Sequence, residues 1–227
     1  MRDQLVEFFD KKGLFNCGQH GLRKGRSCLS QLLAHQQEYI MDSLEEGSNV
    51  DTCIYLDFAK AFDKVDHGIV MHKLSSMGIK GKLGKWIHSF LHGRFQRVAV
   101  NGTRYVKSCS ACTCTYCSCV PQGLVLGPFL FLALISDIDT NVEHSITSSF
   151  ADDTRVTRKV KTHEDTELLQ EDLNTIYRWA AENNMLFNES KFEALRYGSN
   201  NNIKEHTNYN TTQGPIDFKS DLCDLWA

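Results

Sequence analysis

The chain has 227 residues, of which 41% are hydrophobic and 23% are charged, and its net charge is −3. The charge is unevenly distributed: residues 1–107 are basic, with 16 Lys or Arg against 11 Asp or Glu, and residues 108–227 are acidic, with 9 against 17. These values exclude a wholly disordered chain, a collagen-like repeat and a coiled coil, and they suit one or two folded domains. The longest apolar run, residues 124–135, is interrupted by Gly127 and Pro128 and is too short to span a bilayer; no signal-peptide pattern opens the sequence. We therefore expect an intracellular protein of the nucleus or cytoplasm, neither secreted nor membrane-bound, with reduced cysteines.

The first helix with a clear start signal begins after Ser27, a typical N-cap residue, and ends at Gly47. Its expected core-facing stripe is Leu29, Leu32, Leu33, Ile40 and Leu44.

Residues 53–58 favour a short strand. On a strand, Cys53, Tyr55 and Asp57 share one face, and Ile54, Leu56 and Phe58 share the other. The apolar face requires a helix against it, so Asp57 is expected to point the opposite way.

Two helices and a basic segment come next. Asp66 is expected to cap a helix that runs to Met77, and residues 83–91 show a second helical stripe. Residues 80–107 carry positive charge alone, on Lys80, Lys82, Lys85, Arg94, Arg97, Arg104 and Lys107. Such a segment suits a surface that contacts nucleic-acid phosphates, and a solvated basic face explains it equally well.

The rest of the chain mixes strands and helices. The predicted strands are residues 94–101, 145–150, 154–160 and 192–197, and the predicted helices are a buried one through Ile138 and one capped by Thr162 and Asp165. The polar segment from Gly198 onward indicates a loop or a frayed tail. This pattern predicts an α+β fold, an antiparallel sheet with helices packed on one face.

Carboxylates stand at two places where a soluble core does not require them. Asp57 lies within an apolar strand, and Asp152 and Asp153 adjoin at a predicted hairpin tip. If the two strands are neighbours, all three converge, and two Mg²⁺ ions (or Mn²⁺) between them resolve the repulsion and suit phosphoryl transfer. We expect Asp152 to be a metal ligand and Asp153 an outer helper. Taken alone, an Asp-Asp turn is more often plain surface decoration.

Four blocks in order resemble the reverse transcriptase of non-LTR (LINE-type) retrotransposons. They are residues 19–27 (QHGLRKGRS), 55–67 (YLDFAKAFDKVDH), 120–131 (VPQGLVLGPFLF) and 150–153 (FADD), and residues 184–191 resemble the block after them. The resemblance implies a right-hand polymerase with partial fingers at 1–49, a palm at 50–198 and a polar tail at 199–227 where a missing thumb begins. It also implies RNA-directed DNA polymerase activity with an RNA template, a DNA primer and dNTPs.

By motif position, the resemblance makes Asp57, Asp152 and Asp153 catalytic, with Asp57, the carbonyl of Phe58 and Asp152 as metal ligands. Phe62 falls where the family keeps a ring that excludes a ribose 2′-hydroxyl. Nucleotide contacts are implied for Phe62, Gln122, Gly123, Arg23, Lys24, Arg26 and Lys191, and nucleic-acid contacts for Lys80, Lys82, Lys85, Arg94 and Arg97. The alternatives without a functional role are that Phe62 is an ordinary core residue and that Arg23 and Arg26 are ordinary surface charges.

The sequence also departs from the family pattern. Leu124 replaces a small hydroxyl residue, Cys119 replaces a glycine, and five cysteines lie within residues 109–119. Structural zinc sites draw ligand pairs from two separated knuckles, so we expect no zinc there. Two rival functions stay open: a truncated, catalytically silent copy that keeps metal and nucleic-acid binding, and a non-enzymatic RNA-binding remnant.

Overall fold

The computed structural model describes residues 1–92, 95–100, 103–108, 120, 125–198 and 209–218, without the side chains of residues 38, 52–55, 95–100 and 103–108. The chain divides into two compact units. Unit 1 comprises Met1–Phe15 and Lys60–Ser136, and unit 2 comprises Asn16–Ala59 and Asp137–Ala227.

Unit 1 is mainly helical. Its elements are α1 (Arg2–Lys12), the 3₁₀ turn η2 (Ala61–Asp63), α4 (His67–Ser76), α5 (Gly81–Leu91), the hairpin β2 (Phe95–Val100) and β3 (Thr103–Ser108), and α6 (Gly127–Ile135). All of α6 except Pro128 is buried, and the ring of Phe129 lies 4.8 Å from that of Phe9. The part of the apolar run that forms α6, residues 127–135, is therefore a core helix. None of the helices among the described residues is long and apolar enough to cross a membrane.

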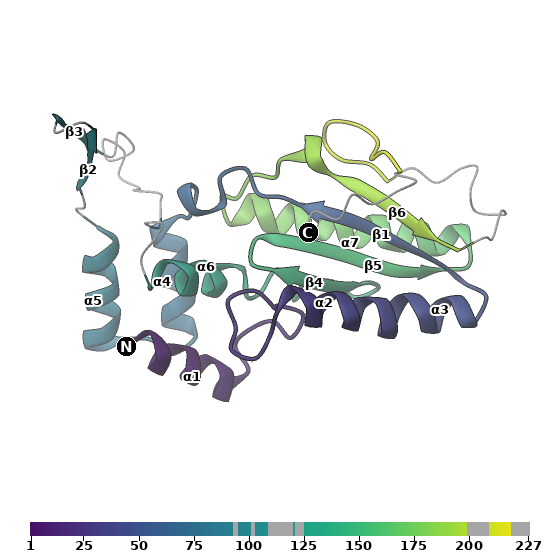
Figure 1. Ribbon diagram of the computed structural model, residues 1–227, viewed down its shortest axis with the longest axis horizontal. Helices are drawn as coiled ribbons and strands as arrows, with labels where there is room; N and C mark the ends of the chain where they lie inside the picture. The colour runs from purple at the N-terminus through teal and green to yellow at the C-terminus, as the bar shows by residue number, and fades with distance from the viewer. Residues whose placement is uncertain (93–94, 101–102, 109–119, 121–124, 199–208, 219–227) are drawn as a thin grey trace. The chain divides into compact units, whose positions relative to one another are not determined.

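Unit 2 is built on a four-stranded antiparallel sheet in the order β4-β5-β1-β6 (Figure 1). The strands are β1 (Asn49–Leu56), β4 (Ile146–Phe150), β5 (Asp153–Val160) and β6 (Glu193–Tyr197). The helices are α2 (Cys28–Ala34), the π-helix η1 (His35–Met41), α3 (Asp42–Glu45), α7 (His163–Glu182) and the 3₁₀ turn η3 (Glu189–Lys191). The predicted α+β class with an antiparallel sheet is confirmed, and β1, at the centre, pairs with both β5 and β6.

Helices cover both faces of this sheet. Arg158 on β5 contacts Asp165 of α7, whereas Lys159, the next residue, contacts Glu46 after α3. Successive residues of a strand point to opposite faces, so α7 and the segment α2–η1–α3 lie on opposite sides. The sequence pattern predicts helices on one face of the sheet, where α7 lies, and the structure adds the segment α2–η1–α3 on the other face.

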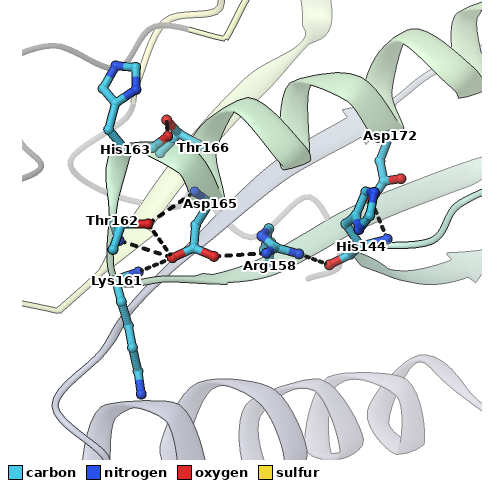
Figure 2. Close-up of polar contacts among 8 residues, drawn as sticks. All are labelled: His144, Arg158, Lys161, Thr162, His163, Asp165, Thr166 and Asp172. Carbon is cyan, nitrogen blue, oxygen red and sulfur yellow. Dashed lines mark hydrogen bonds and ion pairs between the residues drawn. The ribbon is translucent and has the colours of Figure 1, made fainter.

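A polar network fixes the start of α7 on the sheet (Figure 2). The Thr162–Asp165 capping box forms as predicted, and the Asp165 carboxylate also accepts a hydrogen bond from Arg158 at 2.8 Å. Asp172, which is itself buried, accepts hydrogen bonds from the backbone amides of Glu143 and His144, both at 3.0 Å. These bonds join α7 to β5 and to the loop before β4.

Unit 2 buries one carboxylate that the sequence analysis did not single out. Asp51 on β1 is 0% exposed, and its two carboxylate oxygens accept hydrogen bonds from Nε and Nη2 of Arg196 and from the Tyr209 hydroxyl, the last at 2.7 Å. Tyr209 and Ile216 are buried, so residues 209–218 form a loop anchored at two points, which is the first of the two alternatives expected for the polar segment.

The predicted stripe after Ser27 is wrong in part. Ser27 caps α2 as expected, but Leu29 and Leu33 are exposed, and Gln31 and His35 face the interior. The buried face of α2 is polar instead: the side chain of Gln31 is 1% exposed and donates a hydrogen bond to Oγ of Ser148 at 2.8 Å. A polar partner this far along the chain leaves no mark on hydrophobic periodicity, so the apolar pattern alone selects the wrong face of α2.

We predict that His35 makes the stability of the chain fall in mild acid. Burial first, and then the Arg155 charge, lower the pKa of His35 to about 4 from its ordinary 6.5. Between pH 6.5 and 4 the unfolded state binds a proton that the native state refuses, so the free energy of unfolding falls by up to about 3 kcal/mol as the pH drops through this window. Urea unfolding of the wild type and His35→Gln at several pH values measures the difference.

The matched control is His163→Gln, because His163 is exposed at the start of α7. It should keep the wild-type pH dependence between pH 6.5 and 4. Equal slopes for the wild type and His35→Gln would contradict the prediction.

Candidate functional site

Asp57 directly follows β1 and is held by backbone pairing. The register of β1 with β5 shifts between Cys53 and Leu56, so the strict alternation predicted for residues 53–58 does not run through this strand. Such irregularities re-aim the side chains next to them. The Asp57 carbonyl then accepts a hydrogen bond from the Asn188 amide at 2.7 Å, and Phe58 pairs with Phe187.

Buried aromatic packing holds the backbone beside this carboxylate. Leu56 and Phe58 are 2% and 3% exposed, and the Phe58 ring stacks on Phe187 at 4.7 Å. Asp57, between them, is only half-buried. The predicted orientation of Asp57 away from the apolar residues beside it is thus confirmed, whereas the side chains of residues 53–55 lie outside the described ones.

The second pair of carboxylates lies at the β4–β5 hairpin. Phe150 pairs with Asp153, so Ala151 and Asp152 are the two turn residues. Ala151 adopts a left-handed backbone with φ of 56°. The predicted hairpin is confirmed, and Asp152 stands in the turn while Asp153 begins β5.

The structure brings the three carboxylates into one electrostatic group. Burial first, and then the neighbouring charges of Asp152 and Asp57, raise the pKa of Asp153 to about 6. The pKa of Asp152 is raised as well, by burial and by the charge of Asp57. Leu56 pairs with Thr154 on the neighbouring strand, so Asp57 and Asp153 each adjoin a paired residue, and the negative charges of the three carboxylates oppose one another there.

Lys191 supplies the opposite charge. Its ammonium nitrogen lies 2.7 Å from Oδ2 of Asp57, and this contact raises the pKa of Lys191. The Lys191 charge also lowers the pKa of both Asp152 and Asp153. The turn η3 carries this lysine, so the segment 184–191, singled out in the sequence, contributes directly to the acidic group.

The remaining predicted site residues fall into three sets. Arg23 donates to the carbonyl of Asn16, and Arg26 donates to those of Cys17 and Gln19, so both guanidinium groups brace their own loop. Phe62, in unit 1, is half-buried and stacks on Phe131 with ring centres 4.8 Å apart. Lys24, Lys80, Lys82 and Lys85 are exposed.

Several predictions fall outside the described residues. Gln122, Gly123, Arg94 and the cysteine cluster 109–119 are not among them, and Arg97 is described by its backbone alone. One residue that sequence reasoning passed over is Gln19, whose side chain bonds to the backbone of Ala151. Its place in the motif block 19–27 is the sequence signal that points to it.

The acidic group suits a hard cation by its chemistry. Oxygen donors are the ligands that Mg²⁺ prefers, and three mutually repelling carboxylates gain from a nearby positive charge. Across the described ranges, no three or more His, Cys, Asp or Glu side chains are already grouped so as to hold a metal ion. With Lys191 paired to Asp57, the ammonium provides the compensating charge.

The sequence of the chain is similar to that of known polymerases. Residues 2–218 match the family "Reverse transcriptase (RNA-dependent DNA polymerase)". The RNA-directed DNA polymerase from mobile element jockey of Drosophila funebris is 31% identical over 164 residues, and that of Drosophila melanogaster is 33% identical over 160 residues. These alignments cover 67% and 66% of this chain but only 17% of each relative, so the chain spans a small part of their length.

Solved telomerase structures share the fold. The telomerase of Candida tropicalis in complex with a fragment of telomeric RNA has a TM-score of 0.58 and 11% identity, over 88% of this chain and 33% of the telomerase. The truncated apo telomerase of the same organism has a TM-score of 0.52 and 9% identity, over 88% of this chain and 40% of the other. At these identities the likeness concerns the fold alone.

We predict that Asp153→Asn stabilises the metal-free chain. The change removes a desolvated charge from beside Asp57 and Asp152, and the gain in the free energy of unfolding should be about 1 kcal/mol after allowing for solvent screening. Urea unfolding in EDTA at pH 7.5 measures it. Glu167→Gln, an exposed change on α7, should have no such effect; an Asp153→Asn chain no more stable than the wild type would refute charge repulsion at the site.

Proposed function

The chain belongs to the reverse transcriptase (RNA-dependent DNA polymerase) family, and on that premise we propose that it carries the palm of a LINE-type RNA-directed DNA polymerase. In this proposal it extends the 3′-hydroxyl of a DNA primer on an RNA template with dNTPs. The observation that carries the proposal is the meeting of Asp57 with Asp152 and Asp153 in one electrostatic group. Phosphoryl transfer needs such a group because the protein's main task is to position reactants and stabilise charge.

The proposed metal ligands are Asp57, the carbonyl of Phe58 and Asp152. The Asp57 carbonyl is engaged by Asn188, and Phe58 occupies the non-hydrogen-bonded position of that pairing, where the backbone carbonyl points away from the partner segment. Divalent ions, when bound, activate the attacking hydroxyl and stabilise the departing pyrophosphate. Asp153 is proposed to support Asp152 from the adjoining position.

Lys191 fits a charge-balancing role in this site. Its side chain is 62% exposed, so its long flexible stem can leave Asp57 without disturbing the core. We propose that the ammonium neutralises Asp57 in the metal-free chain and turns to the phosphates of the incoming nucleotide once a cation takes over at the carboxylates. Arg23, Lys24 and Arg26 remain proposed contacts to that nucleotide, as do Gln122 and Gly123.

The proposed nucleic-acid contacts are basic residues of unit 1. Lys80, Lys82 and Lys85 are exposed at the start of α5, where their charges are open to solvent. Each phosphate that such a residue neutralises releases counterions, so binding of a template and primer should weaken steeply with salt. Because the proposed substrates, dNTPs and an RNA template, are found inside cells, we propose that the protein acts in the nucleus or the cytoplasm.

The proposal predicts that Asp152→Asn abolishes primer extension. The amide keeps the volume of the carboxylate but loses the charge that attracts a divalent ion, so kcat should fall by about 100-fold or more. Extension of a DNA primer on an RNA template with Mg²⁺ and dNTPs measures the loss. The matched control is Asp42→Asn at an exposed position on α3. No extension by the wild type, or equal extension by Asp152→Asn, would overturn the proposal.

A second prediction concerns the choice of sugar. If the Phe62 ring excludes the 2′-hydroxyl, Phe62→Ala should raise the ratio of rNTP to dNTP incorporation, measured as kcat/KM, by about tenfold or more. The change also removes the stacking on Phe131, so Phe131→Leu serves as the control for lost packing. That control should leave the ratio unchanged, and an unchanged ratio in Phe62→Ala would remove the steric role.

A further inference from the structure

The side-chain amide of Gln19 pairs with both backbone groups of Ala151. Oε1 of Gln19 accepts a hydrogen bond from the Ala151 amide at 2.8 Å, and Nε2 of Gln19 donates to the Ala151 carbonyl at 3.0 Å. Gln19 is 3% exposed, and the two residues lie 132 positions apart in the sequence. The amide of Gln19 therefore uses a donor and its acceptor on one residue, and we call this pair of hydrogen bonds to Ala151 the clamp.

The clamped residue needs support. Ala151 has a φ of 56°, a backbone conformation that glycine adopts freely and a residue with a Cβ does not. It is the first residue of the two-residue turn, and Asp152 is the second. Any relaxation of Ala151 toward negative φ would rotate the following peptide and move Asp152.

The segment that carries Gln19 is itself fixed on the sheet. Gln19 forms a parallel bridge with Ser149 of β4: the Ser149 amide donates to the Gly18 carbonyl at 2.9 Å, and the His20 amide donates to the Ser149 carbonyl at 2.8 Å. A Cβ on Gly21 would come within 2.2 Å of the Ala151 nitrogen, so only glycine allows this approach. The Gly21 amide also donates to Oε1 of Gln19 at 2.7 Å, which orients the side chain.

We propose that Gln19 is a positioning residue for catalysis: it holds Ala151 in its left-handed conformation and thereby fixes where Asp152 presents its carboxylate. The catalytic part of this inference rests on the proposed polymerase function. The clamp also links the loop that carries Arg23 and Arg26 to the acidic hairpin, so that both are positioned by the same edge of β4.

The chain offers a matched control for this clamp. Gln170 on α7 pairs in the same way with Asn210, accepting from its amide at 2.7 Å and donating to its carbonyl at 3.1 Å. The hydrogen bonds of this pairing hold Asn210, which lies outside the β4–β5 hairpin. Loss of either glutamine removes one amide clamp, and only loss of Gln19 should affect the hairpin.

The first experiment tests the clamp without any activity. Amide hydrogen exchange at Ala151 is measured in the metal-free wild type, in Gln19→Met and in Gln170→Met. Since the Ala151 amide bonds to Oε1 of Gln19, its exchange should speed up by about tenfold or more in Gln19→Met and stay as in the wild type in Gln170→Met. Equal exchange in all three chains would overturn the clamp.

The second experiment tests the effect on catalysis through primer extension. Gln19→Met should lower kcat by about 10- to 100-fold, since a displacement of about 1 Å at a reacting group has that effect, with KM for dNTP unchanged. Gln19→Glu, which keeps the side-chain volume but cannot donate to the Ala151 carbonyl, should change kcat in the same direction. Gln170→Met should keep the wild-type kcat.

A rescue distinguishes positioning from general damage. Glycine at 151 adopts the left-handed conformation unaided, so Ala151→Gly added to Gln19→Met should restore a large part of kcat. Failure of this rescue, or wild-type kcat in Gln19→Met, would overturn the positioning role. A wild type that extends no primer would overturn the proposed function and the catalytic part of this inference together, while the exchange result would decide the clamp independently.

Discussion

The pairing of Phe150 with Asp153 leaves only Ala151 and Asp152 to reverse the chain between β4 and β5, and the arrangement of the acidic group depends on that short turn. A longer loop would let the two adjacent carboxylates separate and relax. The two-residue turn instead fixes them beside Asp57, where burial and mutual repulsion raise the pKa of Asp152 and Asp153. The site is thus held in an unfavourable arrangement by hydrogen bonds and packing elsewhere, as functional sites often are.

The central strand shows two ways of neutralising a carboxylate. Asp51 is fully buried and takes a guanidinium and a phenol hydroxyl, both rigid donors from the sheet and from residues 209–218. Asp57, six residues later, takes the ammonium of Lys191, a flexible side chain that is mostly in solvent. A rigid bidentate partner suits a permanent structural pair, whereas a mobile point charge can be exchanged for another cation. The same strand therefore serves stability at one end and the proposed chemistry at the other.

The sequence predicted most of the regular elements because their signals are local. The caps at Ser27 and Thr162, the hairpin at Ala151–Asp152 and the pairing of the strands next to Asp57 and Asp153 are expected from the sequence and are present. What it missed depends on contacts between distant residues: the burial of Gln31 against Ser148 in place of Leu29 and Leu33, the burial of Asp51 against Tyr209, and the role of Gln19. Polar residues that act by bonding to a backbone far along the chain carry no periodic pattern, so composition and spacing cannot reveal them.

The central position of β1 has a consequence for how the chain is made. During synthesis β1 leaves the ribosome before both of the strands that pair with it. Its buried Asp51 can bond to Tyr209 only after a further 158 residues have been made. Gln19 likewise bonds to Ala151, which is synthesised 132 residues later. Closing such long loops is slow, and unpaired strand edges are exposed to other chains meanwhile. Biogenesis of this domain should therefore depend on protection of the nascent chain until nearly all of it has been translated.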